Sequence, residues 1–497
     1  MAILLDLANE LLLPILDYLP PIEMVSLAMS CKRINTLAQD NLTLQRQRIK
    51  KYQNVTLWGC CRHQTRPHPI LLLRDICNDW RVAYYARSLV IECCGSHPTP
   101  WVTDSDRSWN ETAQAAYLMP LEAEKVKSVL PKITTTVCKM LRMALRWDEA
   151  KVNNALDMTE HGARGAILGL LVVSLPTIKS VSLKGYVWRD DLWIDSLKSI
   201  IDQQNPHSGS SGASFLMDVS ELNLIQQYES RSAMSWSIVP FATLPSLRVI
   251  RGASLKSYSI DNNLFADNFG LPPSPVTEID LQRTHLTTND IGNVLRYVQV
   301  LTRFRYDRQE NIYRGAEPGE IFRALLTCAS QSLESLALTS ATASREPWDE
   351  DITESLRGFK VLKELHLPSN ASVASKSISN WRSLATEYTP RLVDLLPASI
   401  ETVRLVGEMT WKEIAPLLLG LPEGKAEYLP KLKEILFKVG RDQGEAHKQT
   451  QALAPLDQER GMVIQLNEDE AARYDGHYSG RFFFFSRSTL ATQTCQL

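Results

Sequence analysis

The chain has 497 residues, of which 44% are hydrophobic and 22% are charged, and its formal net charge is −2. A chain of this length holds two to four domains, or one small module and a long repeat array. It has no overall basic excess, so we expect neither a nucleic acid nor a membrane surface as a partner.

The nine cysteines are odd in number, unevenly spaced and include two adjacent pairs, Cys60-Cys61 and Cys93-Cys94. This usage is typical of a reducing compartment rather than of a disulfide framework. The first residues also lack the basic region of a secretory signal, and Asp6 and Glu10 interrupt the apolar run. We therefore expect the protein in the cytoplasm, the nucleus or both.

The first segment, residues 3–19, is unusually apolar for a surface helix. Twelve of its 17 residues are apolar, but two aspartates, an asparagine, a glutamate and a proline interrupt the run. A membrane span needs about 20 nearly uninterrupted apolar residues, so this segment is not one. A helix that is apolar around most of its circumference must be buried on several sides, and a module of about 40 residues has too little interior for that. The surplus predicts that a second protein covers part of this segment.

Four short helices are predicted in residues 1–51. The first begins at the N-cap Asn9 and contains Pro14, whose missing amide is tolerated best near the first turn. Pro20-Pro21 ends this helix and starts the second, and the third and fourth cover residues 32–38 and 39–51. The apolar residues at helical spacing are Leu12, Ile15, Leu16 and Leu19 in the first helix, and Met24, Leu27, Ala28 and Cys31 in the second.

One family pattern runs through these helices. The residues that carry it are Leu7, Glu10-Leu11, Ile15-Leu16, Leu19, Leu27 and Cys31-Lys32-Arg33. In this order they resemble an F-box, whose pattern is Leu-Pro-x-Glu-Leu, Ile-Leu, Leu, Asp-Leu, Leu, then Cys-Lys-Arg and an aromatic residue. The chain departs from it at Ala8, where proline is usual, at Glu23-Met24, where Asp-Leu is usual, and at Ile34, where Trp or Phe is usual.

The resemblance implies two partners, because in that family the F-box docks on a Skp-type adaptor, which ties it to a cullin scaffold. The adaptor-binding residues that it implies are Leu7, Ala8, Glu10, Leu11, Ile15, Leu16, Leu19, Met24, Leu27, Cys31 and Ile34. The alternative is a local three-helix cap of the domain that follows. We place the F-box at residues 1–50 and linker helices at residues 51–80.

A second pattern, apolar-x-x-apolar-x-apolar, recurs through the rest of the chain. Its nine copies are Ile178/Val181/Leu183, Val219/Leu222/Leu224, Leu247/Ile250/Gly252, Val276/Ile279/Leu281, Leu301/Phe304/Tyr306, Leu333/Leu336/Leu338, Leu362/Leu365/Leu367, Ile400/Val403/Leu405 and Leu432/Ile435/Phe437, with a weaker tenth at Ala86/Leu89/Ile91. The last two positions alternate like a strand with one buried face. Helical stretches, such as residues 291–300 and 320–329, lie between copies.

The copies span 254 residues from Leu183 to Phe437 in eight intervals, or about 32 residues each. This arrangement resembles irregular leucine-rich repeats, although the asparagine that usually follows the motif is absent. We expect an α/β fold: an N-terminal three-helix F-box, then an irregular leucine-rich-repeat solenoid at residues 81–481 with a curved parallel sheet and outer helices. The alternative is a generic α/β domain whose strands share a motif.

Several stretches interrupt or follow the repeats. We expect a helical insertion at residues 95–157, a flexible loop at 203–214 and a long polar loop at 440–470. The final segment, residues 482–497, begins with four phenylalanines, Phe482 to Phe485. It is interpreted as a terminal strand that covers the last repeat, or as a partner-docking tail.

No enzyme motif is present in the chain, which has no phosphate loop, dinucleotide fingerprint, nucleophile elbow or metalloprotease helix. The metal-like clusters are Cys60-Cys61 with His63 and His68, and Cys93-Cys94 with His97. Zinc sites favour Cys-x-x-Cys spacing, so we interpret these cysteines as buried thiols. We expect no cofactor and no catalysis.

Each strand places the residue between its two apolar positions on the opposite, concave face. That column contains Ser182, Asn223, Arg251, Asp280, Arg305, Ala337, His366, Arg404 and Leu436, and a neighbouring column contains Glu278, Arg303, Glu364 and Glu434. The substrate-binding candidates are Arg251, Arg303, Arg305, His366 and Arg404, which suit an acidic or phosphorylated segment. The competing interpretation is a structural ladder, in which acidic neighbours such as Asp280 neutralise the arginines.

The function expected from both patterns is that of a substrate receptor of an F-box-type ubiquitin ligase. The helices would hold the adaptor, and the solenoid would hold a protein substrate whose identity the sequence does not reveal. The alternative is an F-box scaffold or regulatory protein that acts outside a ligase. Nothing in the sequence indicates a homo-oligomer.

Overall fold

The computed structural model describes residues 6–58, 69–92, 174–184, 218–225, 239–242, 244–255, 274–308, 318–340, 356–368, 391–409, 411–439 and 463–468, with residue 216 and short pieces between 142 and 171. Most of the insertion expected at 95–157 lies outside these residues, as do the loop at 203–214 and the tail with Phe482 to Phe485. Within the described residues, no helix is long and apolar enough to cross a membrane.

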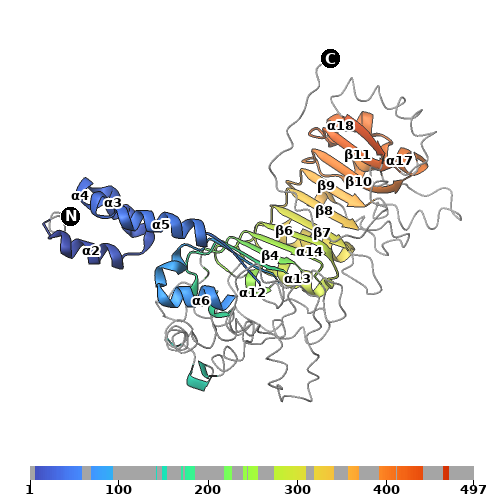
Figure 1. Cartoon of the computed structure of the whole chain (residues 1–497). Coiled ribbons are helices and arrows are strands. Elements are labelled where there is room, and N and C mark those ends of the chain that lie inside the picture. Colours follow the sequence, from blue (N-terminus) through green and yellow to red (C-terminus); the bar gives the residue numbers. More distant parts are fainter. Residues whose placement is uncertain are drawn as a thin grey trace.

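Four helices form the N-terminal module, as the sequence predicts: α2 (Asn9–Tyr18), α3 (Pro21–Ser30), α4 (Lys32–Leu37) and α5 (Gln39–Tyr52). The predicted N-cap was wrong by one residue, because Ala8 has the extended cap conformation and Asn9 is already helical. The small core of this module contains Leu16, Met24, Ala28, Ile34 and Ala38. Figure 1 shows the module projecting from one end of a long sheet, with α5 nearest to the sheet.

The described residues form one sheet of twelve parallel strands in chain order. They are β1 (Asn54–Trp58), β2 (Ser88–Glu92), β3 (Ser180–Lys184), β4 (Glu221–Ile225), β5 (Val249–Ala253), β6 (Glu278–Thr284), β7 (Arg303–Arg308), β8 (Ser335–Ser340), β9 (Glu364–Pro368), β10 (Thr402–Met409), β11 (Glu434–Val439) and β12 (Val463–Glu468). Together with the N-terminal helices, this confirms the predicted α/β fold with a long parallel sheet.

The ten copies of the repeat motif correspond to β2 through β11, so the motif located these strands correctly. Two strands were missed. β1 lies where linker helices were expected, and β12 lies inside the loop expected at 440–470. β1 follows the motif if Tyr52 is counted as its first apolar residue. β12 follows it only at the last two positions, because Gly461 occupies the first.

Each repeat enters the sheet through the same hydrogen bonds. At ten junctions, one carbonyl accepts hydrogen bonds from two successive amides of the next repeat; for example, Thr302 and Arg303 both donate to Thr277. The apolar motif residues point to the opposite side from the polar columns and join one continuous core from Tyr52 to Phe437. Repeated local geometry with contacts between neighbours is the structural definition of a solenoid.

Helices of varied length cover the apolar side of the sheet. They are α6 (Pro69–Asn78), η1 (Trp80–Tyr84), α12 (Val239–Ala242), α13 (Thr288–Tyr297), α14 (Pro318–Ala329), η4 (Leu356–Gly358), α16 (Leu392–Leu395), α17 (Trp411–Leu418) and α18 (Leu421–Tyr428). The predicted helical stretches at 291–300 and 320–329 correspond to α13 and α14, which lie along the same side of the sheet (Figure 1).

Candidate functional site

Large apolar side chains are exposed on the N-terminal module to an unusual degree. Five of the eleven that the described residues expose lie between positions 11 and 29, namely Leu11, Leu13, Tyr18, Ile22 and Met29. Leu11 and Tyr18 are seven residues apart on α2, as are Ile22 and Met29 on α3, so each pair lies on one side of its helix. Tyr18 is 82% exposed and Met29 is 79% exposed. We call these two pairs the apolar stripes.

The adaptor-contact residues predicted from the family pattern divide into two sets. Ala8, Glu10 and Leu11 are exposed, and Leu7, Ile15, Leu19, Leu27 and Cys31 are half-buried, so all eight present some surface to a partner.

The other three, Leu16, Met24 and Ile34, are at most 2% exposed and form the interior of the module. These three side chains shape the module from within, and their assignment as adaptor contacts stays a prediction. The family pattern mixes residues that shape the module with residues that face outward. Tyr18 and Met29 were missed, although the seven-residue spacing from Leu11 and from Ile22 was a signal for them.

The start of α2 is anchored by a side chain rather than by a cap. Ala8 has no side-chain acceptor, so α2 lacks a capping hydrogen bond at its first turn. Instead, Arg33 donates to the Leu7 carbonyl at 2.7 Å and to the Asn9 amide oxygen at 2.7 and 3.0 Å. Arg33, at the start of the third helix, thereby holds the chain entering α2.

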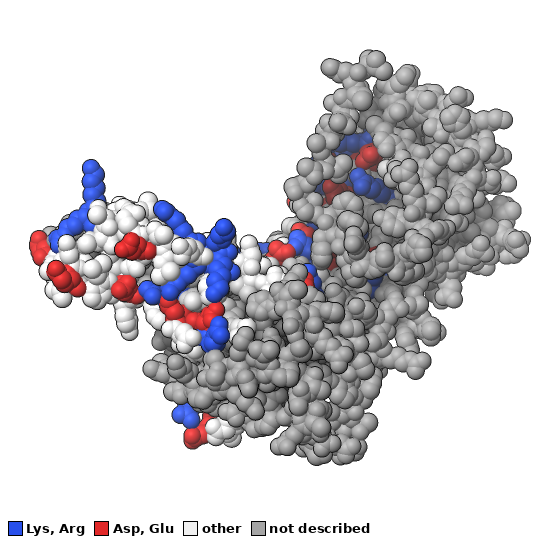
Figure 2. All heavy atoms as spheres, viewed as in Figure 1, with Lys and Arg blue, Asp and Glu red and all other residues white. Residues whose placement is uncertain are grey.

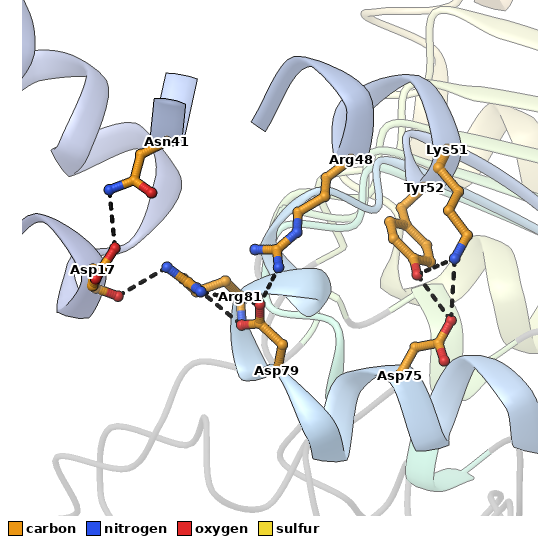
Figure 3. Close-up of polar contacts among 8 residues, drawn as sticks. All are labelled: Asp17, Asn41, Arg48, Lys51, Tyr52, Asp75, Asp79 and Arg81. Carbon is orange, nitrogen blue, oxygen red and sulfur yellow. Dashed lines mark hydrogen bonds and ion pairs between the residues drawn. The ribbon is translucent and has the colours of Figure 1, made fainter. Parts of the chain in front are cut away.

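The end of α2 is connected to the first repeat through a group of polar residues (Figure 3). Arg81, in η1, donates to the backbone carbonyl of Asp17 at 2.9 Å, and Asn41 donates to the Asp17 carboxylate at 2.9 Å. Asp79 accepts from Arg81 at 2.9 and 3.1 Å and pairs with Arg48 of α5 at 2.6 Å. Burial acts to raise the pKa of Asp79, but the hydrogen bonds from Arg81 lower it overall. We call these five residues the α2 C-terminal network.

A second polar cluster ties α5 to α6 beside this network. Tyr52 donates to Asp75 at 2.8 Å, and Lys51 lies 3.5 Å from the same carboxylate (Figure 3). Burial acts to raise the pKa of Asp75, but hydrogen bonds from Arg74 and Tyr52 lower it below its ordinary value. The carboxylate therefore stays charged and keeps both helices in contact at neutral pH.

The side of the sheet opposite the apolar core is polar, and we call it the polar face. Strand register aligns the predicted column from Ser182 to Leu436 residue by residue, including Arg251 beside Asp280, Asp280 beside Arg305, and His366 beside Arg404. The prediction succeeded because parallel strands in equal register place identical motif positions next to each other.

Acidic and basic residues of the polar face pair across strands. Arg251 donates to Glu221 and lies 3.7 Å from Glu278, and Arg303 lies 3.8 Å from the same Glu278. In Figure 2, acidic and basic side chains adjoin along the sheet. The predicted ladder is confirmed, and Glu221 neutralises Arg251 most directly, since it accepts a hydrogen bond from that arginine.

Two arginines near His366, Arg404 on the adjacent strand and Arg305 two strands away, lie farther from their acidic neighbours than Arg251 does from Glu221. Arg305 lies 3.8 Å from Asp280 and Arg404 lies 3.9 Å from Glu434, beyond hydrogen-bonding distance. His366 is mostly buried, and its Nε2 atom has no hydrogen-bond partner among the described residues. Burial, together with the positive charges of Arg305 and Arg404, lowers the pKa of His366 to about 4. A neutral imidazole with two flanking guanidinium groups results.

The described part of the chain contains no group of three or more His, Cys, Asp or Glu residues placed to hold a metal ion. Both cysteine and histidine clusters from the sequence lie outside the described residues. Burial raises the pKa of the half-buried Cys328 thiol to about 11, so the thiol stays protonated at neutral pH.

Comparison with known families identifies one domain. Residues 4–45 match the F-box domain, and the match ends before β1. No curated protein matches the chain. An F-box domain implies binding to a Skp-type adaptor and, through that adaptor, to a cullin.

Proposed function

We propose that this chain is a non-catalytic substrate receptor of a ligase built from a Skp-type adaptor, a cullin and an F-box protein. The supporting observation is that the apolar stripes lie within the residues that match the F-box domain. Apolar area of this kind is stabilised when a partner removes it from water. On this proposal, the adaptor covers Leu11 and Tyr18 on α2 and Ile22 and Met29 on α3.

The polar face is the proposed surface for a protein substrate. Arg305, His366 and Arg404 are the preferred contacts, since their charged or polar atoms are only loosely paired with the other described residues. Arg251 contributes less, because Glu221 already pairs with it directly, whereas Arg303 lies as far from its acidic neighbour Glu278 as Arg305 does from Asp280. Such a surface suits a segment that carries acidic groups.

The role of the chain in ubiquitin transfer is positioning. A receptor that holds a substrate near a ubiquitin-charged enzyme raises the effective concentration of the substrate lysines without taking part in the chemistry. In this role, no residue of the chain needs to touch the reacting atoms.

The test is co-purification of the full chain with a Skp-type adaptor and a cullin. Tyr18→Asp together with Met29→Asp adds charge to the apolar stripes, and adaptor recovery is expected to fall at least tenfold while the helices stay folded. Gln47→Asp is the matched control, because it adds charge to an exposed position of α5 outside the stripes. Equal recovery of both variants would contradict the docking surface.

The same experiment addresses the scaffold alternative. Recovery of the adaptor without the cullin, and no protein that accumulates when this chain is lost, would favour an F-box protein that acts outside a ligase. Recovery of the cullin with an accumulating partner supports the substrate receptor.

A further inference from the structure

We propose that Arg81, a residue of the first repeat, is a positioning residue for the adaptor surface, because it caps the C-terminal end of α2 from outside the F-box. The inference rests on the proposed function, since it concerns the same docking surface. It adds that this surface is completed by the repeat domain rather than by the F-box residues alone.

Within its own module, the side chains that hold the ends of α2 are Arg33 at its start and Asn41 at Asp17. The helix has no side-chain cap at Ala8, it contains Pro14, and its C-cap residue Leu19 is extended. Only Leu12 and Leu16 of its ten residues are buried. A ten-residue helix is too short to be stable in water by itself, so its external contacts decide how well it is ordered.

Arg81 provides such a contact at the end of the helix. Its Nη1 donates to the carbonyl of Asp17, a residue 64 positions earlier in the chain, at 2.9 Å. The last carbonyls of a helix lack partners within the helix and carry partial negative charge, so a guanidinium group at this place satisfies one of them and opposes the helix dipole. Asp17 directly precedes Tyr18, so the capped residue is next to a main exposed residue of the apolar stripes.

The guanidinium group of Arg81 is fixed in direction before it meets α2. Its Nε and Nη2 donate to the two carboxylate oxygens of Asp79 at 2.9 and 3.1 Å, and the Arg81 amide donates to Asp79 at 3.1 Å. Asp79 is itself held by Arg48 at 2.6 Å. Bidentate pairing of this kind sets the geometry of the arginine as well as its charge, which leaves Nη1 aimed at the Asp17 carbonyl (Figure 3).

The two sides of the α2 C-terminal network come from different parts of the protein. Asn41 and Arg48 belong to α5, whereas Asp79 and Arg81 belong to the segment that enters β2. The end of the helix that carries Leu11 and Tyr18 is therefore held by η1, the short helix that precedes β2. Binding of the adaptor to α2 and placement of the polar face are coupled through Arg81.

The test compares three variants of the full chain. Arg81→Ala is expected to weaken adaptor binding about tenfold and to speed amide hydrogen exchange in α2, with no change in the exchange of the sheet. Arg81→Lys keeps the charge near Asp17 and is expected to restore part of both losses. Arg87→Ala is the matched control, because Arg87 also donates to a distant carbonyl, that of Thr177, but makes this contact within the repeats.

Adaptor binding of Arg81→Ala equal to that of the unaltered chain would overturn the proposal. Equal losses for Arg81→Ala and Arg87→Ala would also overturn it, since they would show general destabilisation of the repeats. If the unaltered chain binds no Skp-type adaptor, the proposed function fails. In that case, exchange in α2 still decides whether Arg81 caps the helix.

Discussion

Leu16→Ala is expected to unfold the F-box locally, which is a different effect from removing an adaptor contact. Leu16 is fully buried in a core whose other buried members are Met24, Ala28, Ile34 and Ala38. Replacing a buried leucine by alanine typically costs about 2–5 kcal/mol, and a small module seldom has more than about 3–5 kcal/mol of stability. The substitution thus removes most of the stability of α2 to α4.

The assay measures amide hydrogen exchange in each helix of the full chain. The affinity of the same variants for the adaptor is measured in parallel. A loss of about 3 kcal/mol corresponds to about 150-fold faster opening of α2 and α3. Tyr18→Ala is the comparison, because an exposed residue changes stability by only about 0.5 kcal/mol. It is expected to lose adaptor affinity with unchanged exchange. The reasoning is refuted if Leu16→Ala keeps its protection and loses only adaptor affinity, since Leu16 would then contact the adaptor directly.

Three further predictions concern the repeats. The pKa of His366 falls from about 6.5 in the unfolded chain to about 4 in the fold, so its contribution to stability is complete above pH 6.5 and is lost as the pH falls toward 4. This contribution to the free energy of unfolding is up to about 3 kcal/mol. When unfolding by denaturant is measured across this pH range, His366→Gln is expected to lack this part of the pH dependence of stability. Lys363→Gln removes an exposed pair with Glu334 at 2.8 Å, so the unfolding temperature is expected to fall slightly at low salt and to match the unaltered chain at about 1 M salt. Thr287→Ala removes the capping box that Thr287 forms with Asp290 at the start of α13, and a loss of about 1 kcal/mol is expected in urea unfolding, with no loss indicating that the cap is dispensable.

Much of the architecture was predictable from local patterns. Leu336 and Leu338 alternate toward the core, and the same motif recurs in each repeat. The alternation of apolar and polar residues within a strand shows which face of the strand is buried. Parallel stacking of the repeats then determines which residues are neighbours on adjacent strands. For this reason the sequence alone predicts the polar column, with Arg305 next to Asp280. The motif did not predict β12, because glycine occupies its first position, where the motif requires an apolar side chain.

The division of the N-terminal helices into buried and exposed faces was predicted less well, because helical spacing alone does not say which side of a short helix faces inward. Leu16 and Leu11 both belong to the family pattern, yet one is buried and the other is exposed. Packing of α2 against the helices that follow decides between them. A partly apolar helix in a small module has two candidate inner faces, and only the neighbouring helices select one.

The sequence by itself determined the two kinds of structure in this protein, an apolar helical module and a long array of strand repeats, because both are encoded by spacing within a few residues. The tertiary structure alone decided how they are joined. The contact between Arg81 and the Asp17 carbonyl involves a backbone atom that every residue possesses, so no side-chain pattern marks it. Only the folded path of the chain from α5 to η1 brings that donor to the end of α2.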